Sequence, residues 1–174
     1  MDNKNIHLDL YNRAYQGFTP DRIEQEISDI DLFMEQNSKS LITFLKTYYS
    51  QFGSLDTLRD KSVLELGCGL GGLSHFLVKH AKMVTGIDIS GLAIMNAREI
   101  AKQKELNIQF EVGDVCGGVE LAQKFDVIVD SHLFHCITTN QQRKNYLSFI
   151  KLHLANGGTY LCETMAHNEE LQEP

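Results

Sequence analysis

The sequence predicts an α/β fold in which a doubly wound, mainly parallel sheet carries helices on both faces. Short apolar runs of strand length alternate with helical stretches from about residue 60 onward, and a glycine-rich turn follows the first of these runs. Strands that alternate with helices in this way form βαβ units with right-handed crossovers. The chain has 174 residues, which suits one domain of ordinary size.

The expected strands and helices follow one another in alternation. Each strand is a short apolar run, and Ser90 is placed to cap the helix that follows the second strand. The strands are expected at 63–66, 83–87, 108–112, 125–129 and 159–163, and the helices from the glycine turn to about 81 and at 90–104, 119–123 and 140–154.

Residues 1–55 have a different pattern, which predicts a helical cap on the sheet. Pro20 opens a helical period that runs to about Asn37, and a second helical period follows it and stops near Gly53. We therefore expect residues 56–174 to form a single compact α/β unit.

The charge and the cysteines argue against several classes of partner. The formal net charge is −7 and no cluster of Lys and Arg is present, so we expect no nucleic acid and no membrane as partner. No run reaches the roughly 18 apolar residues of a membrane span, and no signal peptide is recognised. The four cysteines form no C-x-x-C pair, which indicates free thiols in a reducing, cytoplasmic compartment.

The strongest local signal is the run 65–72, Glu-Leu-Gly-Cys-Gly-Leu-Gly-Gly, between a buried strand and a helix. Such a turn lets backbone approach a ligand closely, at the carboxyl end of a strand. Gly67, Gly69 and Gly72 fit the spacing G-x-G-x-x-G, and Asp88 follows about twenty residues later. An NAD-dependent oxidoreductase is therefore one interpretation.

The acid at the start of this run favours a different ligand. Glu65 precedes the first glycine by two residues, where it would repel a diphosphate at a cost of roughly 1–4 kcal/mol. The same carboxylate suits a ligand that carries an ammonium and a sulfonium group. The sign of the charge therefore separates the two cofactor classes.

The pattern Glu65-x-Gly67-x-Gly69-x-Gly71 resembles the first motif of the class I S-adenosylmethionine-dependent methyltransferases, which have a Rossmann-like fold. In that family the loop wraps the methionine part of the cofactor. The resemblance, which covers about residues 58–163, implies that Glu65, Cys68 and the three glycines bind S-adenosyl-L-methionine.

Three further matches follow in the order of the family. The resemblance implies that Asp88 holds the ribose hydroxyls, that Asp114 accepts a bond from the adenine amino group, and that Asp130 reaches the methionine end of the cofactor. Ile89 and Val115 would sandwich the adenine. Asp88 could instead cap a helix and Asp114 could be an ordinary turn residue, although Ser90 is the better placed cap.

The segment after the fourth strand carries the candidate base. His135 is our first choice and His132 our second, because an imidazole titrates near neutral pH; packed or solvent-facing histidines are the alternative. Cys136 completes a group that could bind a soft cation, but its spacing matches no standard metal site, so we expect no metal.

The acceptor is expected to be a small molecule. The stretch 130–135 is similar to small-molecule methyltransferases of the thiol, halide and metalloid type, and the chain lacks the Pro-Pro-aromatic and Pro-Cys motifs of several nucleic-acid enzymes. A protein methyltransferase and a non-catalytic cofactor-binding module remain alternatives.

Only eleven residues follow Glu163, whereas the family continues with a helix and an antiparallel hairpin. We therefore expect the C-terminal strands to be missing. An uncovered sheet edge invites pairing, which predicts a homodimer.

Overall fold

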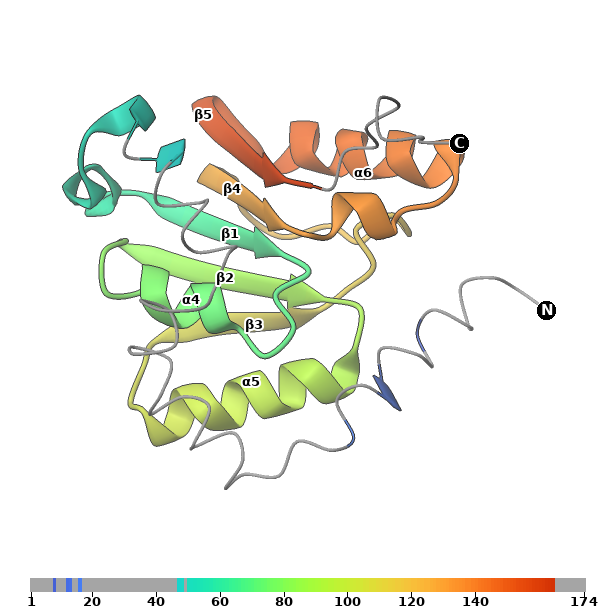
Figure 1. Cartoon of the computed structure of the whole chain (residues 1–174), viewed down its shortest axis with the longest axis horizontal. Helices are drawn as coiled ribbons and strands as arrows, with labels where there is room; N and C mark the ends of the chain where they lie inside the picture. Colours follow the sequence, from blue (N-terminus) through green and yellow to red (C-terminus); the bar gives the residue numbers. More distant parts are fainter. Residues whose placement is uncertain (1–7, 9–11, 14–15, 17–46, 49, 165–174) are drawn as a thin grey trace, which may run out of the picture.

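The computed structural model describes residues 8, 12–13, 16, 47–48 and 50–164, with the backbone alone for Ser131. Its described part contains one parallel sheet with the strand order β3-β2-β1-β4-β5 (Figure 1). The strands are β1 (Ser62–Leu66), β2 (Met83–Asp88), β3 (Ile108–Val112), β4 (Phe125–Ser131) and β5 (Leu154–Glu163). The helices are α4 (Gly72–Leu77), α5 (Gly91–Gln103) and α6 (Asn140–His153), with the 3-10 turns η1 (Leu55–Leu58) and η2 (Phe134–Cys136).

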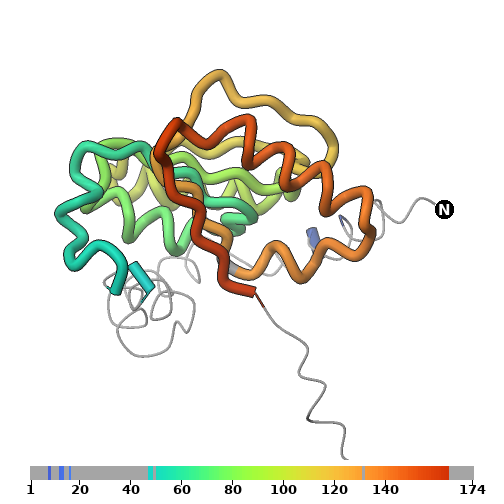
Figure 2. The backbone as a smooth tube through the Cα atoms, turned by 90° about the horizontal axis from the view of Figure 1, so that it is seen from above, coloured from blue at the N-terminus to red at the C-terminus, as the bar shows by residue number. Residues whose placement is uncertain are grey.

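Alternate residues of the central strand face two different layers, which makes the sheet doubly wound. Val63 packs with Leu73 and Leu77 of α4, whereas its neighbour Leu64 packs with Tyr146 of α6. Both faces are apolar, as expected for parallel strands covered on both sides. Figure 2 accordingly shows residues 47–58 and α6 on opposite sides of β5.

The carboxyl ends of all five strands lie at one edge, because the pairing is parallel throughout (Figure 1). The turns that follow β1, β2, β3 and β4 therefore meet there. Asn12 also reaches this edge, where the Ser90 hydroxyl donates to Asn12 Oδ1 at 2.7 Å.

Most of the predicted elements are confirmed. The first four strands begin and end within two residues of their predicted bounds. Ser90 caps α5, as its hydroxyl accepts the Ala93 N–H at 3.2 Å. Asp126 ties the start of β4 to β1, as its Oδ2 accepts the Ser62 N–H at 2.8 Å and the Ser62 hydroxyl at 2.9 Å.

Two predicted element boundaries, the start of β5 and the end of α4, differ from those in the structure. β5 begins at Leu154 and not at 159, because the expected turn pairs partly with β4: Leu154 lies opposite Phe125, and Thr159 lies opposite Val127. α4 ends at Leu77, four residues before the predicted end, and short turns follow it.

The helix predicted at 119–123 is wrong. Residues 115–118 form a turn, with φ of 85° at Gly118, and residues 119–124 have no regular structure, with a bend at 122–123. The N–H of Leu121 donates to Nε2 of His153 in α6 at 2.9 Å. The conformation of this segment is therefore determined by a contact with a distant helix and not by its own sequence pattern.

The predicted cap of residues 1–55 lies mostly outside the described residues. Residues 47–48 and 50–52 are helical, and Gly53 follows with φ of 75°, as expected at a helix end. Tyr48 is buried against the α4 face of the sheet, and its hydroxyl bonds to that of Thr57 at 2.7 Å. Within the described ranges, no helix has the length and apolar character to cross a bilayer.

Gly86, in the middle of β2, makes room for the packing beneath the glycine turn. A Cβ at this position would lie 2.8 Å from the Phe110 ring and 2.9 Å from the Cys68 sulfur. Real Cβ atoms do not approach other atoms so closely, so Phe110 or the turn would have to shift.

We predict that Gly86→Ala lowers the free energy of unfolding by roughly 1–3 kcal/mol through overpacking. Gly91→Ala is the matched control, because nothing lies within 4 Å of a Cβ there. Urea denaturation followed by circular dichroism measures both. Equal stability of the two variants would contradict the packing described for Gly86.

Candidate active site

The glycine turn between β1 and α4 is held by hydrogen bonds to the end of β2. The N–H groups of Gly67 and Cys68 donate to the carbonyl of Ile87 at 2.8 and 3.1 Å. The N–H of Gly69 donates to Asp88 Oδ2 at 2.9 Å. The turn therefore lies on the carboxyl ends of both strands, where ligands bind in open α/β sheets.

Three glycines of this turn adopt the left-handed backbone region that side chains disfavour. φ is 66° at Gly67, 53° at Gly69 and 78° at Gly71. A Cβ on Gly67 would also lie only 3.1 Å from the Cβ of Leu133. The segment after β4 therefore packs directly against the glycine turn.

Glu65 is buried at the end of β1 and holds the first turn of α4. It is 4% exposed, and its Oε2 accepts the Ser74 N–H at 2.8 Å and the Ser74 hydroxyl at 2.5 Å. Burial raises the Glu65 pKa to about 7 against the lowering effect of these bonds, and the charge of Asp88 adds to the rise. The carboxyl group is thus partly protonated at neutral pH, and a cationic ligand beside it would favour its charged form.

Asp88 connects the turns that follow β1 and β2. Its Oδ2 accepts from Gly69 and its Oδ1 accepts the Ser90 N–H at 2.8 Å, while its carbonyl accepts the Gly113 N–H at 2.9 Å. Burial raises the Asp88 pKa, and the backbone bonds oppose that rise. Each carboxylate oxygen has a second lone pair, so Asp88 can still accept bonds from a ligand.

The residues expected around an adenine lie at the next strand end. Asp114 follows β3 and its Oδ1 accepts the Cys116 N–H at 2.9 Å, which forms a tight turn. Val115 is buried in the same cluster as Ile87, and Ile89 is half-buried after β2. Glu65, Asp88 and Asp114 thus stand at the ends of three neighbouring strands.

Asp130, at the end of β4, differs from its expected placement because it faces α6. It is fully buried; its Oδ1 accepts the Leu133 N–H at 2.7 Å and its Oδ2 accepts the Tyr146 hydroxyl. The Tyr146 hydroxyl in turn lies 2.8 Å from that of Tyr160 in β5. Burial raises the pKa of Asp130, Tyr146 and Tyr160. The carboxylate therefore positions the segment after β4 through Leu133.

The two candidate bases lie together on that segment. The rings of His132 and His135 meet edge to face with centroids 5.5 Å apart. Nδ1 of His135 is buried without a hydrogen-bond partner. His132 is 41% exposed, and its Nε2 lies 3.6 Å from Glu163 Oε1. Among the residues that the structure describes, no group of three His, Cys, Asp or Glu side chains is arranged to hold a metal ion.

Sequence reasoning missed Ser74, Tyr146, Tyr160 and Glu163. Tyr146 repeats with Phe149 and Ile150 on the buried stripe of α6, so the pattern alone does not distinguish it from core. Ser74 lies nine residues after Glu65, a separation with no recognised motif. Only the fold brings these side chains to the strand ends.

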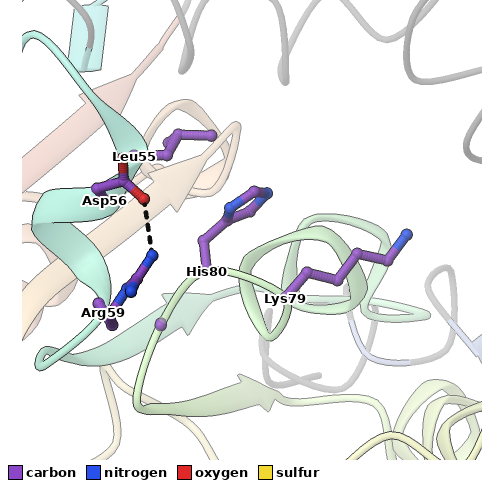
Figure 3. A pocket seen from close by; sticks show the side chains of 6 residues that line it. Leu55, Asp56, Arg59, Lys79 and His80 are labelled. Atoms are coloured by element: carbon purple, nitrogen blue, oxygen red, sulfur yellow. Dashed lines mark hydrogen bonds and ion pairs between the residues drawn. The ribbon is translucent and has the colours of Figure 1, made fainter.

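A separate hollow of about 250 Å³ lies at the opposite end of the sheet, between η1 and the residues after α4 (Figure 3). Asp56 and Arg59 pair across its rim at 3.1 Å. Its lining residues are Leu55, Asp56, Arg59, Lys79, His80 and Ala81. It faces the amino ends of β1 and β2, far from the glycine turn.

Known proteins share this arrangement. Residues 58–173 match the family model of the methyltransferase domain. A ubiquinone biosynthesis O-methyltransferase of Coxiella burnetii is 37% identical over 113 residues, which cover 64% of this chain and 47% of that protein. A 2-heptyl-1-hydroxyquinolin-4(1H)-one methyltransferase of Mycobacteroides abscessus is 30% identical over 100 residues, 57% of this chain and 44% of that protein. The chain therefore spans about half the length of these relatives.

The fold also matches solved structures. An S-adenosylmethionine-dependent methyltransferase from Clostridium acetobutylicum superimposes with a TM-score of 0.61 at 21% identity, covering 78% of this chain and 54% of that one. At this identity the likeness concerns the fold.

The burial of Glu65 predicts how stability depends on pH. Because its pKa is raised from 4.5 to about 7, the folded protein resists ionisation of this group. The stabilisation that Glu65 gives the folded protein is complete below its pKa in the unfolded chain, 4.5, and is lost as the pH rises through the folded pKa of about 7. Between pH 5 and pH 8, wild type should therefore lose roughly 1–3 kcal/mol relative to Glu65→Gln.

Urea denaturation at pH 5, 6, 7 and 8 measures this difference. Glu120→Gln is the control, because Glu120 is exposed. If Glu65→Gln and wild type change in parallel with pH, Glu65 does not titrate in this range.

Proposed function

The chain belongs to the class I S-adenosylmethionine-dependent methyltransferases through its domain of residues 58–173, and from this premise we propose that it transfers a methyl group from S-adenosyl-L-methionine to a small-molecule acceptor.

The observation that carries the proposal is how the N–H groups of the glycine turn are used. Gly67, Cys68 and Gly69 donate to β2, and the Ser74 N–H at the start of α4 donates to Glu65. A diphosphate needs such N–H groups free, together with the helix N-terminus. Here it would meet bonded donors and a carboxyl group, which argues against NAD and for a cationic cofactor.

The chemistry of the donor set fits S-adenosylmethionine. We assign Glu65 to the ammonium end, Asp88 to the ribose hydroxyls and Asp114 to the adenine amino group, since carboxylates accept from each. Gly67, Gly69 and Gly71, with Cys68, would form the wall beside the methionine part. Ile89 and Val115 would flank the adenine. Asp130 contributes indirectly, by holding Leu133 against Gly67.

The cofactor supplies a methyl group already activated by a sulfonium. The protein must align the acceptor with it, exclude water and, for an acceptor with a proton, remove that proton. The segment that contains His132 and His135 packs on the glycine turn through Leu133. His135 therefore remains a candidate base near the transferred methyl group.

The acceptor we propose is a hydroxyl group on a small ring compound. The two relatives are named as an O-methyltransferase and as a methyltransferase of a hydroxyquinolinone. Four free cysteines, Cys68, Cys116, Cys136 and Cys162, support a cytoplasmic location, since thiols persist in reducing compartments. A homodimer through the β5 edge stays a prediction.

Calorimetry with S-adenosylhomocysteine tests the cofactor assignment. We predict micromolar binding by wild type, and binding roughly 5- to 150-fold weaker by Asp88→Asn, which corresponds to about 1–3 kcal/mol for one lost charged acceptor. Asp60→Asn, an exposed carboxylate before β1, is the control and should bind like wild type.

Equal affinity of Asp88→Asn and wild type would remove Asp88 from the site. Binding of NAD in place of S-adenosylhomocysteine would support the oxidoreductase alternative. Tight cofactor binding without transfer to any hydroxylated acceptor would support a non-catalytic module or a protein methyltransferase.

A further inference from the structure

A histidine and a glutamate are joined where β4 and β5 end. The His132 N–H donates to the Glu163 carbonyl at 3.0 Å, and the His132 Nε2 lies 3.6 Å from Glu163 Oε1. The preceding residue, Ser131, pairs with Glu163 in the sheet register. Backbone and side chain therefore both hold His132 beside the last residue of β5.

His132 adopts a backbone conformation that is uncommon for a residue with a side chain. Its φ is 72°, which a non-glycine residue keeps only where its surroundings impose it. Here the surroundings are the bond to Glu163, the Cys136 thiol on the His132 carbonyl at 3.5 Å, and the Leu133 N–H on Asp130. The strained residue is thus fixed by three separate contacts and turns its ring toward β5.

Two buried polar atoms near this pair have no partner among the described residues. They are Oε2 of Glu163 and Nδ1 of His135, whose ring contacts that of His132. Buried polar atoms in folded proteins are almost always bonded, so such atoms at a strand end indicate a place for a polar ligand group. A ligand hydroxyl, which both donates and accepts, can bond Nδ1 of His135 there and still direct its own proton elsewhere.

The pair also lies close to the place assigned to the transferred methyl group. Leu133, the residue after His132, approaches the Cβ position of Gly67 to 3.1 Å. The other titratable groups shown at His132 are His135, whose ring contacts its ring, and Cys136, whose thiol donates to its carbonyl. Asp130 is bonded to Leu133 and Tyr146, so Glu163 is the carboxylate available to the imidazole.

We propose that His132, held by Glu163, is the base in place of His135 and accepts the proton of the acceptor hydroxyl, while His135 Nδ1 holds that hydroxyl by a hydrogen bond. The inference rests on the proposed methyl transfer. As the new O–CH₃ bond forms, the O–H bond breaks and its proton goes to His132 Nδ1, the ring nitrogen that does not face Glu163. The bond between methyl and sulfur breaks with its electron pair left on the sulfur, which becomes a neutral thioether. The imidazolium is stabilised by the Glu163 carboxylate and then returns its proton to water.

In this assignment His132 is the catalytic residue and Glu163 is a positioning residue. The test uses four variants of the full chain: His132→Asn, Glu163→Gln, Glu163→Asp and His80→Asn. Asn tolerates the left-handed backbone of His132, so the first variant keeps the fold. His80, at the opposite end of the sheet, is the matched histidine control (Figure 3).

The first measurement needs no turnover. Imidazole NMR signals of histidine-labelled protein are recorded with S-adenosylhomocysteine bound. We expect the His132 ring signals to shift in Glu163→Gln and to be largely restored in Glu163→Asp, because only the second variant keeps a carboxylate beside the ring. Catechol should shift the His132 and His135 signals and leave His80 in place. Unchanged His132 ring signals in Glu163→Gln would overturn the pairing.

The second measurement is methyl transfer to catechol from radiolabelled S-adenosylmethionine between pH 6 and pH 9. Loss of a general base lowers such rates by roughly 10²- to 10⁴-fold, so His132→Asn should fall by at least about 100-fold at pH 7. The loss should shrink at pH 9, where the phenol ionises unaided, and His80→Asn should match wild type. A wild-type rate and pH profile in His132→Asn would overturn the proposal.

Calorimetry distinguishes a failure of this proposal from a failure of the proposed methyltransferase function. All four variants should bind S-adenosylhomocysteine within about twofold of wild type. If no protein binds it, the proposed function fails; if all bind it and His132→Asn transfers normally, only the role of His132 fails.

Discussion

The carboxylate of Asp88 is the group on which the carboxyl edge of the sheet depends. One of its oxygens holds the glycine turn and the other holds the turn into α5, while its carbonyl receives the loop after β3. The glycine turn, the start of α5 and the loop after β3 are therefore all held by one residue. Because the bond from Gly69 to Asp88 and those to the Ile87 carbonyl use the N–H groups of the glycine turn, these contacts decide which ligands the turn can receive.

The fold could be predicted from the sequence because apolar runs and caps are local signals. The runs at β1 and β3 and the hydroxyl of Ser90 act within a few residues, and each was found where expected. The segment before β4 was not, since its conformation depends on a bond from Leu121 to His153, 32 residues away. No local pattern encodes such a contact.

Only those residues of the candidate site that belong to a recognised motif could be predicted from the sequence. Asp88 and the glycines follow recognised spacings, whereas Glu163 and Tyr146 reach the strand ends from β5 and α6. Asp130 lies near the end of β4, as expected, but its side chain faces the core, which the motif does not encode. Burial also changes Glu65: an acid that the sequence presents as a charge is partly neutral once folded.

The bond between Ser90 and Asn12 spans 78 residues of chain. Closing so long a loop has a large entropic cost, and the bond needs β2 and α5 to be formed before Asn12 has a partner. The contact therefore depends on residues 83–103 being folded, and not on β4 or β5, which contribute neither of its partners.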